Sequence, residues 1–129
     1  EKIDCKINLV ELWIDCCHNS SGAKEVASEI NKMNSKEKKK TKLFFSLKKG
    51  KKIKDFIIPF INVFDEITYI EGNKTHYSYN EIIEKTLSVP IKKSNISNLE
   101  RSLICHQDGP SRILICGSMQ LVGKVIRMF

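Results

Sequence analysis

The chain has 129 residues, of which 41% are hydrophobic and 29% charged, and its formal net charge at pH 7 is +7. This length fits a single domain, residues 1–129, that is large enough to bury a core without disulfides or metals. Its longest apolar runs fall well short of the roughly 20 residues that a membrane-spanning helix needs, and a signal-peptide pattern is lacking. The composition therefore argues against a membrane protein.

Five cysteines, an odd number, occur without C-x-x-C spacing. Disulfide frameworks and zinc sites usually show even numbers or regular spacings of cysteine. We therefore expect reduced thiols in a cytoplasmic protein and no metal site. The protein is also expected to be a monomer.

In the first half of the chain, apolar strands and amphipathic helices alternate. Strands are expected at 3–7, 12–15 and 43–47, and a helix at 21–33. Apolar residues from Ile53 to Phe64 recur at helical spacing, but Pro59 predicts a kink or a restart there.

The second half continues the alternation. Strands are expected at 67–70, 90–93 and 112–116. Two S-x-x-E patterns, at 78–81 and 97–100, predict helix starts, and the last helix is expected at 119–129 with these residues inward: Leu121, Val122, Val125, Ile126 and Phe129.

This alternation predicts a three-layer, Rossmann-like α/β fold. The sheet is expected to have about six strands, mostly parallel, with one antiparallel edge strand. Neither G-x-G-x-x-G nor G-x-x-x-x-G-K-[ST] occurs in the sequence, so the chain lacks the usual loops that hold a nucleotide alone.

One turn concentrates polar groups between a strand and a helix: Asp15-Cys-Cys-His-Asn-Ser-Ser-Gly-Ala23. The carboxyl ends of parallel strands are where ligands of α/β proteins bind. Asp15 could bind a ribose or orient a base, His18 could stabilise charge or move a proton, and Asn19 could bind a ligand. The structural alternative is that Asp15 and Asn19 only satisfy the backbone of the turn.

Two further strand-to-helix turns carry candidate ligands. Cys116-Gly-Ser-Met119 places Ser118 where it can cap a helix or bind an anion, and Lys48-Lys-Gly-Lys-Lys52 offers point charges for a phosphate or carboxylate. His76 and His106 lack ligand-like neighbours in the sequence and are expected to be ordinary surface or packing residues.

A lysine-rich run between Lys36 and Lys54 contains a single acid, Glu37. Such a run could bind nucleic acid or another polyanion, but it also fits a solvated loop and helix start. Arginine is scarce and no nucleic-acid motif accompanies the lysines, which disfavours nucleic acid as the partner.

Three turns together resemble the C-terminal domain of folylpolyglutamate synthase/dihydrofolate synthase, a branch of the Mur ligase superfamily. The turn from Asp15 to Ala23 resembles the family's D-G-A-H-N-P-x-[AG]-[AG], and Leu43-Phe-Phe-Ser-Leu47 resembles its [LV]-F-G-[AS]-L strand. The third is similar to the V-[LT]-G-S-L-Y-L-V-G-E-V ending: Ile113-Leu-Ile-Cys-Gly-Ser-Met-Gln-Leu-Val-Gly-Lys-Val125.

The resemblance implies an ATP-dependent ligase of folate biosynthesis. In such enzymes a dihydropteroate or folate carboxylate becomes an acyl phosphate, and the amine of L-glutamate displaces the phosphate. An N-terminal P-loop domain holds ATP and Mg²⁺, and the C-terminal domain closes over the nucleotide. We expect that P-loop domain to be absent from this chain and the chain alone to be inactive.

The resemblance also implies roles for single residues. Asp15, His18 and Asn19 would bind the nucleotide, with His18 and Asp15 also catalytic, while Ser118 and Lys51 would bind glutamate. The sequence departs from the family pattern at Cys16, Cys17, Ser20, Phe45 and Gln120. Two alternatives stay open: the C-terminal domain of a peptidoglycan Mur ligase, and a stand-alone basic α/β module that binds a polyanion.

Overall fold

The structure, a computed structural model, describes residues 2–3, 10–17, 19–86, 88–104 and 110–128. Its sheet has the strand order β1-β2-β6-β3-β4-β5. The strands are β1 (Lys2–Ile3), β2 (Val10–Ile14), β3 (Lys40–Phe45), β4 (Glu66–Ile70), β5 (Lys92–Ser94) and β6 (Ser111–Cys116). All neighbours pair in parallel except β1, which pairs antiparallel with β2 at one edge.

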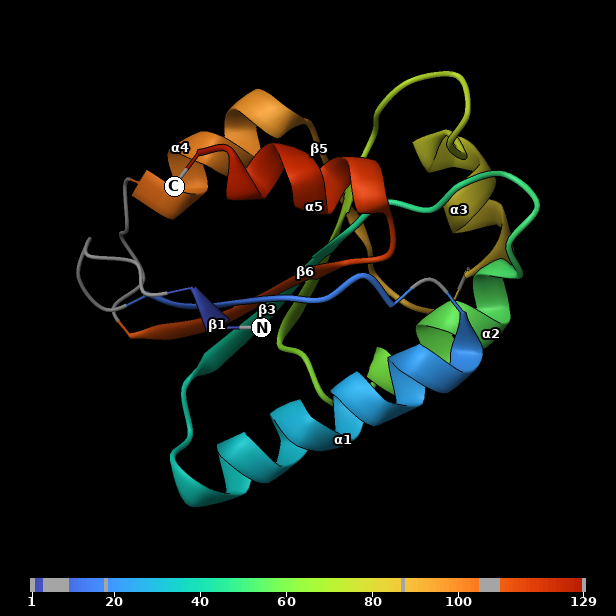
Figure 1. The fold of residues 1–129 in the computed structure, drawn as a ribbon. Helices are drawn as coiled ribbons and strands as arrows, with labels where there is room; N and C mark the ends of the chain where they lie inside the picture. Colours follow the sequence, from blue (N-terminus) through green and yellow to red (C-terminus); the bar gives the residue numbers. More distant parts are fainter. Residues whose placement is uncertain (1, 4–9, 18, 87, 105–109, 129) are drawn as a thin grey trace.

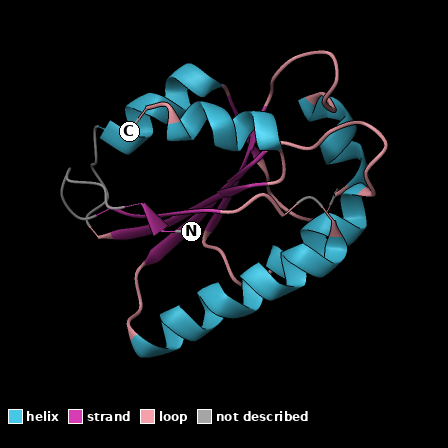
Figure 2. Ribbon diagram, in the orientation of Figure 1, coloured by secondary structure: helices cyan, strands magenta, loops and turns pink. Residues whose placement is uncertain are grey.

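Helices cover both faces of this sheet, as Figures 1 and 2 show. They are α1 (Ser20–Lys36), α2 (Ile53–Ile57), the 3₁₀ helix η1 (Ile58–Phe60), α3 (Tyr79–Lys85), α4 (Ile96–Ile104) and α5 (Met119–Ile126). One buried cluster joins the sheet to α1, α2, η1 and α3, and a second joins it to α4 and α5. The prediction of a three-layer α/β fold with a mostly parallel sheet is confirmed.

The same strands contribute to both clusters, because successive side chains of a strand point to opposite faces of the sheet. Leu43 and Phe45 of β3 face the first cluster, whereas Phe44 between them faces the second. In β6 every residue is buried, as expected for a central strand that is covered on both faces.

Local signals in the sequence account for several helix boundaries. Asn19 caps α1, since its Oδ1 accepts a hydrogen bond from the amide of Gly22. Ser78 and Glu81 form the predicted capping box of α3. Pro59 lies where α2 gives way to η1, so the predicted restart is confirmed.

Two details of the sequence prediction were wrong. The helix expected from an S-x-x-E pattern at 97–100 begins earlier than that pattern predicts, at Ile96, because Asn95 in place of Ser97 caps it by accepting from the amide of Asn98 at 2.9 Å. Ile126, expected inward, is 49% exposed at the last residue of α5. Phe129 and most of the strand predicted at 3–7 lie outside the described residues.

Candidate functional site

The three turns singled out in the sequence follow neighbouring strands and lie at one edge of the sheet. Strand β6 pairs with β2 on one side and with β3 on the other. The pairing continues past the strand ends, since the amide of Asp15 donates to the carbonyl of Ile115 at 3.1 Å and that of Ser46 to Cys116 at 3.4 Å. We call the turns after β2, β3, β4 and β6 the carboxyl edge.

The turn after β2 uses its polar side chains partly on its own backbone. Asp15 Oδ1 accepts from the amide of Cys17 at 2.8 Å, and Asn19 Oδ1 accepts from the amide of Gly22 at 2.9 Å. Asn19 is exposed and Asp15 half-buried. The capping role foreseen as the structural alternative is therefore present, while His18 lies outside the described residues.

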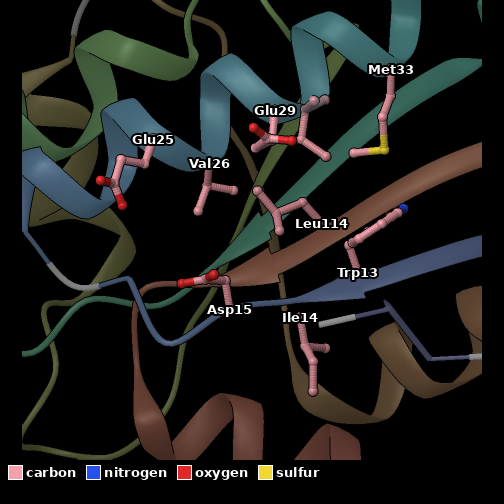
Figure 3. Close-up of a pocket in the computed structure, with 9 residues that line it drawn as sticks. Trp13, Ile14, Asp15, Glu25, Val26, Glu29, Met33 and Leu114 are labelled. Atoms are coloured by element: carbon pink, nitrogen blue, oxygen red, sulfur yellow. The ribbon is translucent and has the colours of Figure 1, made fainter.

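Asp15 also lines a pocket of about 260 Å³ between β2 and α1. Figure 3 shows Trp13 and Asp15 directed toward α1, while Ile14 points to the opposite face of the sheet. Glu25 and Glu29 of α1 line the same pocket. This pocket combines an apolar wall with carboxylates.

The cysteines of the site behave as packing residues. Cys17 and Cys116 are buried and interact with each other, and Cys16 is exposed; all three are free thiols. Burial, with Cys17 beside it, raises the pKa of the Cys116 thiol well above its usual value. A neutral buried thiol is a poor nucleophile, so Cys116 serves the core of the fold.

The turn after β6 is fixed by a glycine. Gly117 has φ +97°, and a Cβ there would lie 2.3 Å from the carbonyl oxygen of Ser46. This close approach brings the turns after β3 and β6 together. Ser118 follows, is buried, and caps α5 by accepting from the amide of Leu121 at 3.4 Å.

The lysine turn after β3 is held in place by the loop after β4. The amide of Lys49 donates to the carbonyl of Thr75 at 2.9 Å. The Tyr77 hydroxyl donates to the carbonyl of Lys51 at 2.8 Å and accepts from the amide of Gly50 at 3.2 Å. These bonds give the lysine turn a defined conformation beside β4.

Lys51 and Ser118, the two residues assigned to glutamate in the sequence, line one pocket. This lysine–serine pocket has a volume of about 260 Å³ and is lined by Lys48, Lys51, Thr75, His76, Gly117, Ser118, Met119 and Gln120. A smaller pocket of about 130 Å³ shares His76, Ser118 and Gln120 with it and adds Glu71 and Lys124. Asp15 lines a different pocket at the same edge.

His76 is a site residue that the sequence reasoning missed. It is 6% exposed, and its Nε2 lies 2.7 Å from the Ser118 hydroxyl. Burial, with Lys48 and Lys124 nearby, lowers the pKa of His76 below its usual value. One signal could have found it, because the loop after β4 ends a parallel strand and therefore emerges at the carboxyl edge.

The lysine-rich run does not form one patch. Lys40 and Lys42 lie in β3 and pair with Glu66, whereas Lys48 and Lys51 follow the opposite end of that strand. A six-residue strand spans roughly 20 Å, which separates the two groups of lysines. Within the part of the chain that the structure describes, no group of three His, Cys, Asp or Glu side chains could hold a metal ion.

Among the described residues, none of the helices combines the length and hydropathy that crossing a bilayer requires.

Comparisons of the sequence found no matching family model, and no curated protein matches it. Solved structures do match. A folylpolyglutamate synthase of Thermotoga maritima aligns with 98% of this chain and 29% of its own, at 13% identity and a TM-score of 0.78. A bifunctional folylpolyglutamate synthase/dihydrofolate synthase of Yersinia pestis, complexed with AMPPNP and Mn, aligns with 91% of this chain and 28% of its own, at 19% identity and a TM-score of 0.73.

A folylpolyglutamate synthase of Mycobacterium tuberculosis complexed with ADP aligns with 92% of this chain, at 15% identity and a TM-score of 0.68. This chain covers 29% of that structure, so it spans less than a third of the enzymes it matches. These likenesses confirm the fold expected from the resemblance, and the chain has the fold of one part of the folylpolyglutamate synthase structures.

Proposed function

We propose that this chain is the C-terminal domain of a folate–glutamate ligase similar to folylpolyglutamate synthase/dihydrofolate synthase. In that reaction, ATP converts a dihydropteroate or folate carboxylate into an acyl phosphate, and the amine of L-glutamate displaces phosphate. The chain supplies the closing face of the site, and a P-loop domain holds ATP and Mg²⁺.

One observation carries the proposal: the three turns that resemble the family's motifs are distant in sequence but meet at a single sheet edge. The amides of Asp15 and Ser46 both donate to carbonyls of β6, which leads into Gly117 and Ser118. A resemblance arising by chance would have no reason to fall on three adjacent turns. The shared fold adds independent support.

The lysine–serine pocket is the proposed glutamate site. The half-buried Lys51 shares this pocket with the buried Ser118, and Lys48 adds a second cation. Cationic and polar groups of this kind position carboxylates and stabilise the charge of the acyl transfer.

Asp15, His18 and Asn19 are the proposed nucleotide ligands, with His18 and Asp15 also acting in catalysis. The turn after β2 stands directly before the N-terminus of α1, where backbone N–H groups favour anions. His18 would face the phosphates, and the half-buried Asp15 carboxylate would bind the ribose or hold the turn.

The proposal is tested by titrating the isotopically labelled chain with L-glutamate and, separately, with a non-hydrolysable ATP analogue. We expect glutamate to shift the resonances of Lys51 and Ser118, and the nucleotide to shift those of Asp15 and Asn19. Shifts confined to β5 or to the end of α1 would contradict the assignment. Phosphate release by the chain alone, given ATP, dihydropteroate and glutamate, would refute the proposal that the chain supplies only part of the active site.

The polyanion-binding module is the second candidate, and the lysine-rich run favours it. Pairing of Lys40 and Lys42 with Glu66 weakens this candidate, as does the separation of the lysines by β3. DNA binding at moderate salt that disappears when Lys38, Lys39 and Lys40 become alanine would support it.

A further inference from the structure

The contact between His76 and Ser118 extends into a chain of defined hydrogen bonds. His76 Nδ1 has two neighbours, the Oδ1 atom of Asn73 at 3.1 Å and the Oγ1 atom of Thr75 at 3.0 Å. On the other side of the ring, Nε2 faces the Ser118 hydroxyl at 2.7 Å. The direction of each hydrogen bond can be assigned from these partners.

The two neighbours of Nδ1 are both acceptors. The backbone amide of Thr75 donates to Asn73 Oδ1 at 3.0 Å, which fixes that atom as the carbonyl oxygen. The Thr75 hydroxyl also donates to Asn73 Oδ1, so its only hydrogen is already used. The proton of a neutral His76 therefore lies on Nδ1, and Nε2 carries the lone pair.

Charges around the ring keep it neutral. Lys48 and Lys51 line the pocket on one side of His76, while Lys124 and Glu71 line the pocket on the other. Three cations against one carboxylate oppose the imidazolium form, and so does burial of the ring.

A neutral His76 with its lone pair on Nε2 must accept the hydrogen of the Ser118 hydroxyl. The Ser118 oxygen then has two lone pairs, one of which takes the amide of Leu121 at 3.4 Å. The other lone pair is left for a ligand, since Ser118 lines both of the adjoining pockets. The hydroxyl can therefore serve the ligand only as an acceptor.

We propose that His76 is a positioning residue that turns Ser118 into a hydrogen-bond acceptor for the ammonium group of an amino-acid ligand, whose carboxylates are bound by Lys48 and Lys51. This inference rests on the proposed function and deepens it, because it assigns the polarity of the glutamate site. Asn73 takes part by holding the imidazole tautomer, and Gln120 accepts from Asn73 Nδ2 at 2.8 Å.

The hydrogen bonds that run from Asn73 through His76 to Ser118, here called the relay, also make the site sensitive to pH. When His76 is protonated, Nε2 carries a hydrogen and donates to the Ser118 oxygen, so the serine hydrogen turns toward the pocket. Ser118 then offers a donor in place of an acceptor. The preference for an ammonium group should fall as pH drops below the pKa of His76.

A first measurement needs no ligand. Long-range ¹H–¹⁵N correlation spectra of the labelled chain distinguish the two nitrogens of His76 at neutral pH. We expect a protonated Nδ1 and a pyridine-like Nε2. A protonated Nε2 would overturn the relay.

A second measurement compares L-glutamate with glutarate, which keeps both carboxylates and lacks the ammonium group. By calorimetry, the wild-type chain is expected to bind glutamate about tenfold more tightly, as one hydrogen bond to a charged group predicts. His76→Phe keeps the ring but removes the acceptor, and should abolish the preference. His76→Gln can restore an acceptor and should recover much of it.

The outcomes separate this inference from the proposed function. Equal binding of both ligands by the wild type, or an unchanged preference in His76→Phe, would overturn the relay and leave the glutamate site standing. If neither ligand binds, the proposed glutamate site is wrong, and the tautomer decides whether the relay exists. Should the variants not fold, the tautomer of the wild type at neutral pH still decides, because a protonated Nε2 on His76 would overturn the inference.

Discussion

The carbonyl oxygen of Ser46 occupies almost the position that a side chain on Gly117 would need, at 2.3 Å from an ideal Cβ. The turn after β6 can therefore lie against the turn after β3 only while residue 117 is glycine. Gly50 has the same φ of +97°, yet nothing lies within 4 Å of its Cβ position.

This pair gives a matched prediction. Gly50→Ala should lower the free energy of unfolding by about 1 kcal/mol, the cost of positive φ alone. Gly117→Ala should cost roughly 3 kcal/mol, because the turn must also move away from Ser46. Urea denaturation measures both, and equal losses would show that the close approach has no energetic weight.

The stabilisation from the ion pair between the buried Arg112 and the half-buried Glu11 should depend on both partners. Arg112 is 2% exposed and donates to Glu11, to Asn34 Oδ1 and to the carbonyl of Glu37 at 3.1 Å. Arg112→Met should cost about 2–3 kcal/mol because the half-buried Glu11 loses its closest cation, and the double variant Glu11→Met, Arg112→Met should recover much of it. A loss below about 1 kcal/mol in the single variant would contradict this account.

The same ion pair should make the free energy of unfolding depend on pH. Burial raises the pKa of Glu11, but hydrogen bonds and the charge of Arg112 outweigh burial and lower it below 4.5. A lowered folded-state pKa means that the stabilisation is present above the unfolded value and is lost as pH falls through the folded one. Unfolding curves from about pH 6 to about pH 3 should show the wild type losing more stability than the double variant.

The residue that caps α4 can be tested, because the structure places Asn95 there and the sequence pattern predicted Ser97. Asn95→Ala should cost about 1 kcal/mol, because its Oδ1 caps the helix, whereas Ser97→Ala should change stability by less than about 0.5 kcal/mol. Thermal unfolding followed by circular dichroism distinguishes the two. A larger loss of stability in Ser97→Ala than in Asn95→Ala would indicate that Ser97 caps α4.

Lys51 and Lys49 offer a matched test of the proposed glutamate site. Lys51 is half-buried and lines the lysine–serine pocket, while Lys49 is exposed and is not among its lining residues. Lys51→Ala should weaken glutamate binding about tenfold, and Lys49→Ala less than twofold, if a local charge binds the carboxylate. Equal losses would indicate only a long-range effect of net charge, which raising the salt concentration would remove.

Tyr77 should affect the same site without touching the ligand. Tyr77→Phe removes the hydroxyl that bridges Gly50 and Lys51, whereas Tyr79→Phe removes a hydroxyl that donates to Ile91 at 2.5 Å. Each should cost about 1 kcal/mol of stability. Only Tyr77→Phe should weaken glutamate binding, by about threefold, since it loosens the lysine turn; an equal effect of both variants would point to general destabilisation.

Much of the fold was predictable because the signals are local. Helical spacing, the Ser78 capping box and the break at Pro59 each depend on neighbours within a few residues. The grouping of three turns was also predictable, since parallel strands of a sheet end at the same edge. The joint assignment of Lys51 and Ser118 to glutamate came from the family resemblance, and the two residues do line one pocket.

The same rule places the loop after β4 at the carboxyl edge, but it does not single out His76 within that loop. Its partners Ser118 and Lys48 are distant in sequence, and the contact depends on β3 lying between β4 and β6. Strand order of this kind is decided by packing of whole elements, and spacing within a segment does not encode it. The buried charge of Arg112, likewise, is explained by partners distant in sequence, foremost Glu11 on the neighbouring strand β2.

The central place of β6 has a consequence for how the protein is made. Strands β2 and β3 do not pair with each other, and both pair with residues 111–116, which follow them at a distance in the sequence. Until those residues leave the ribosome, two apolar strands have unpaired edges that favour aggregation. This sheet therefore cannot form until residues 111–116 have been made, and truncation before Ser111 should yield insoluble products rather than a smaller folded domain.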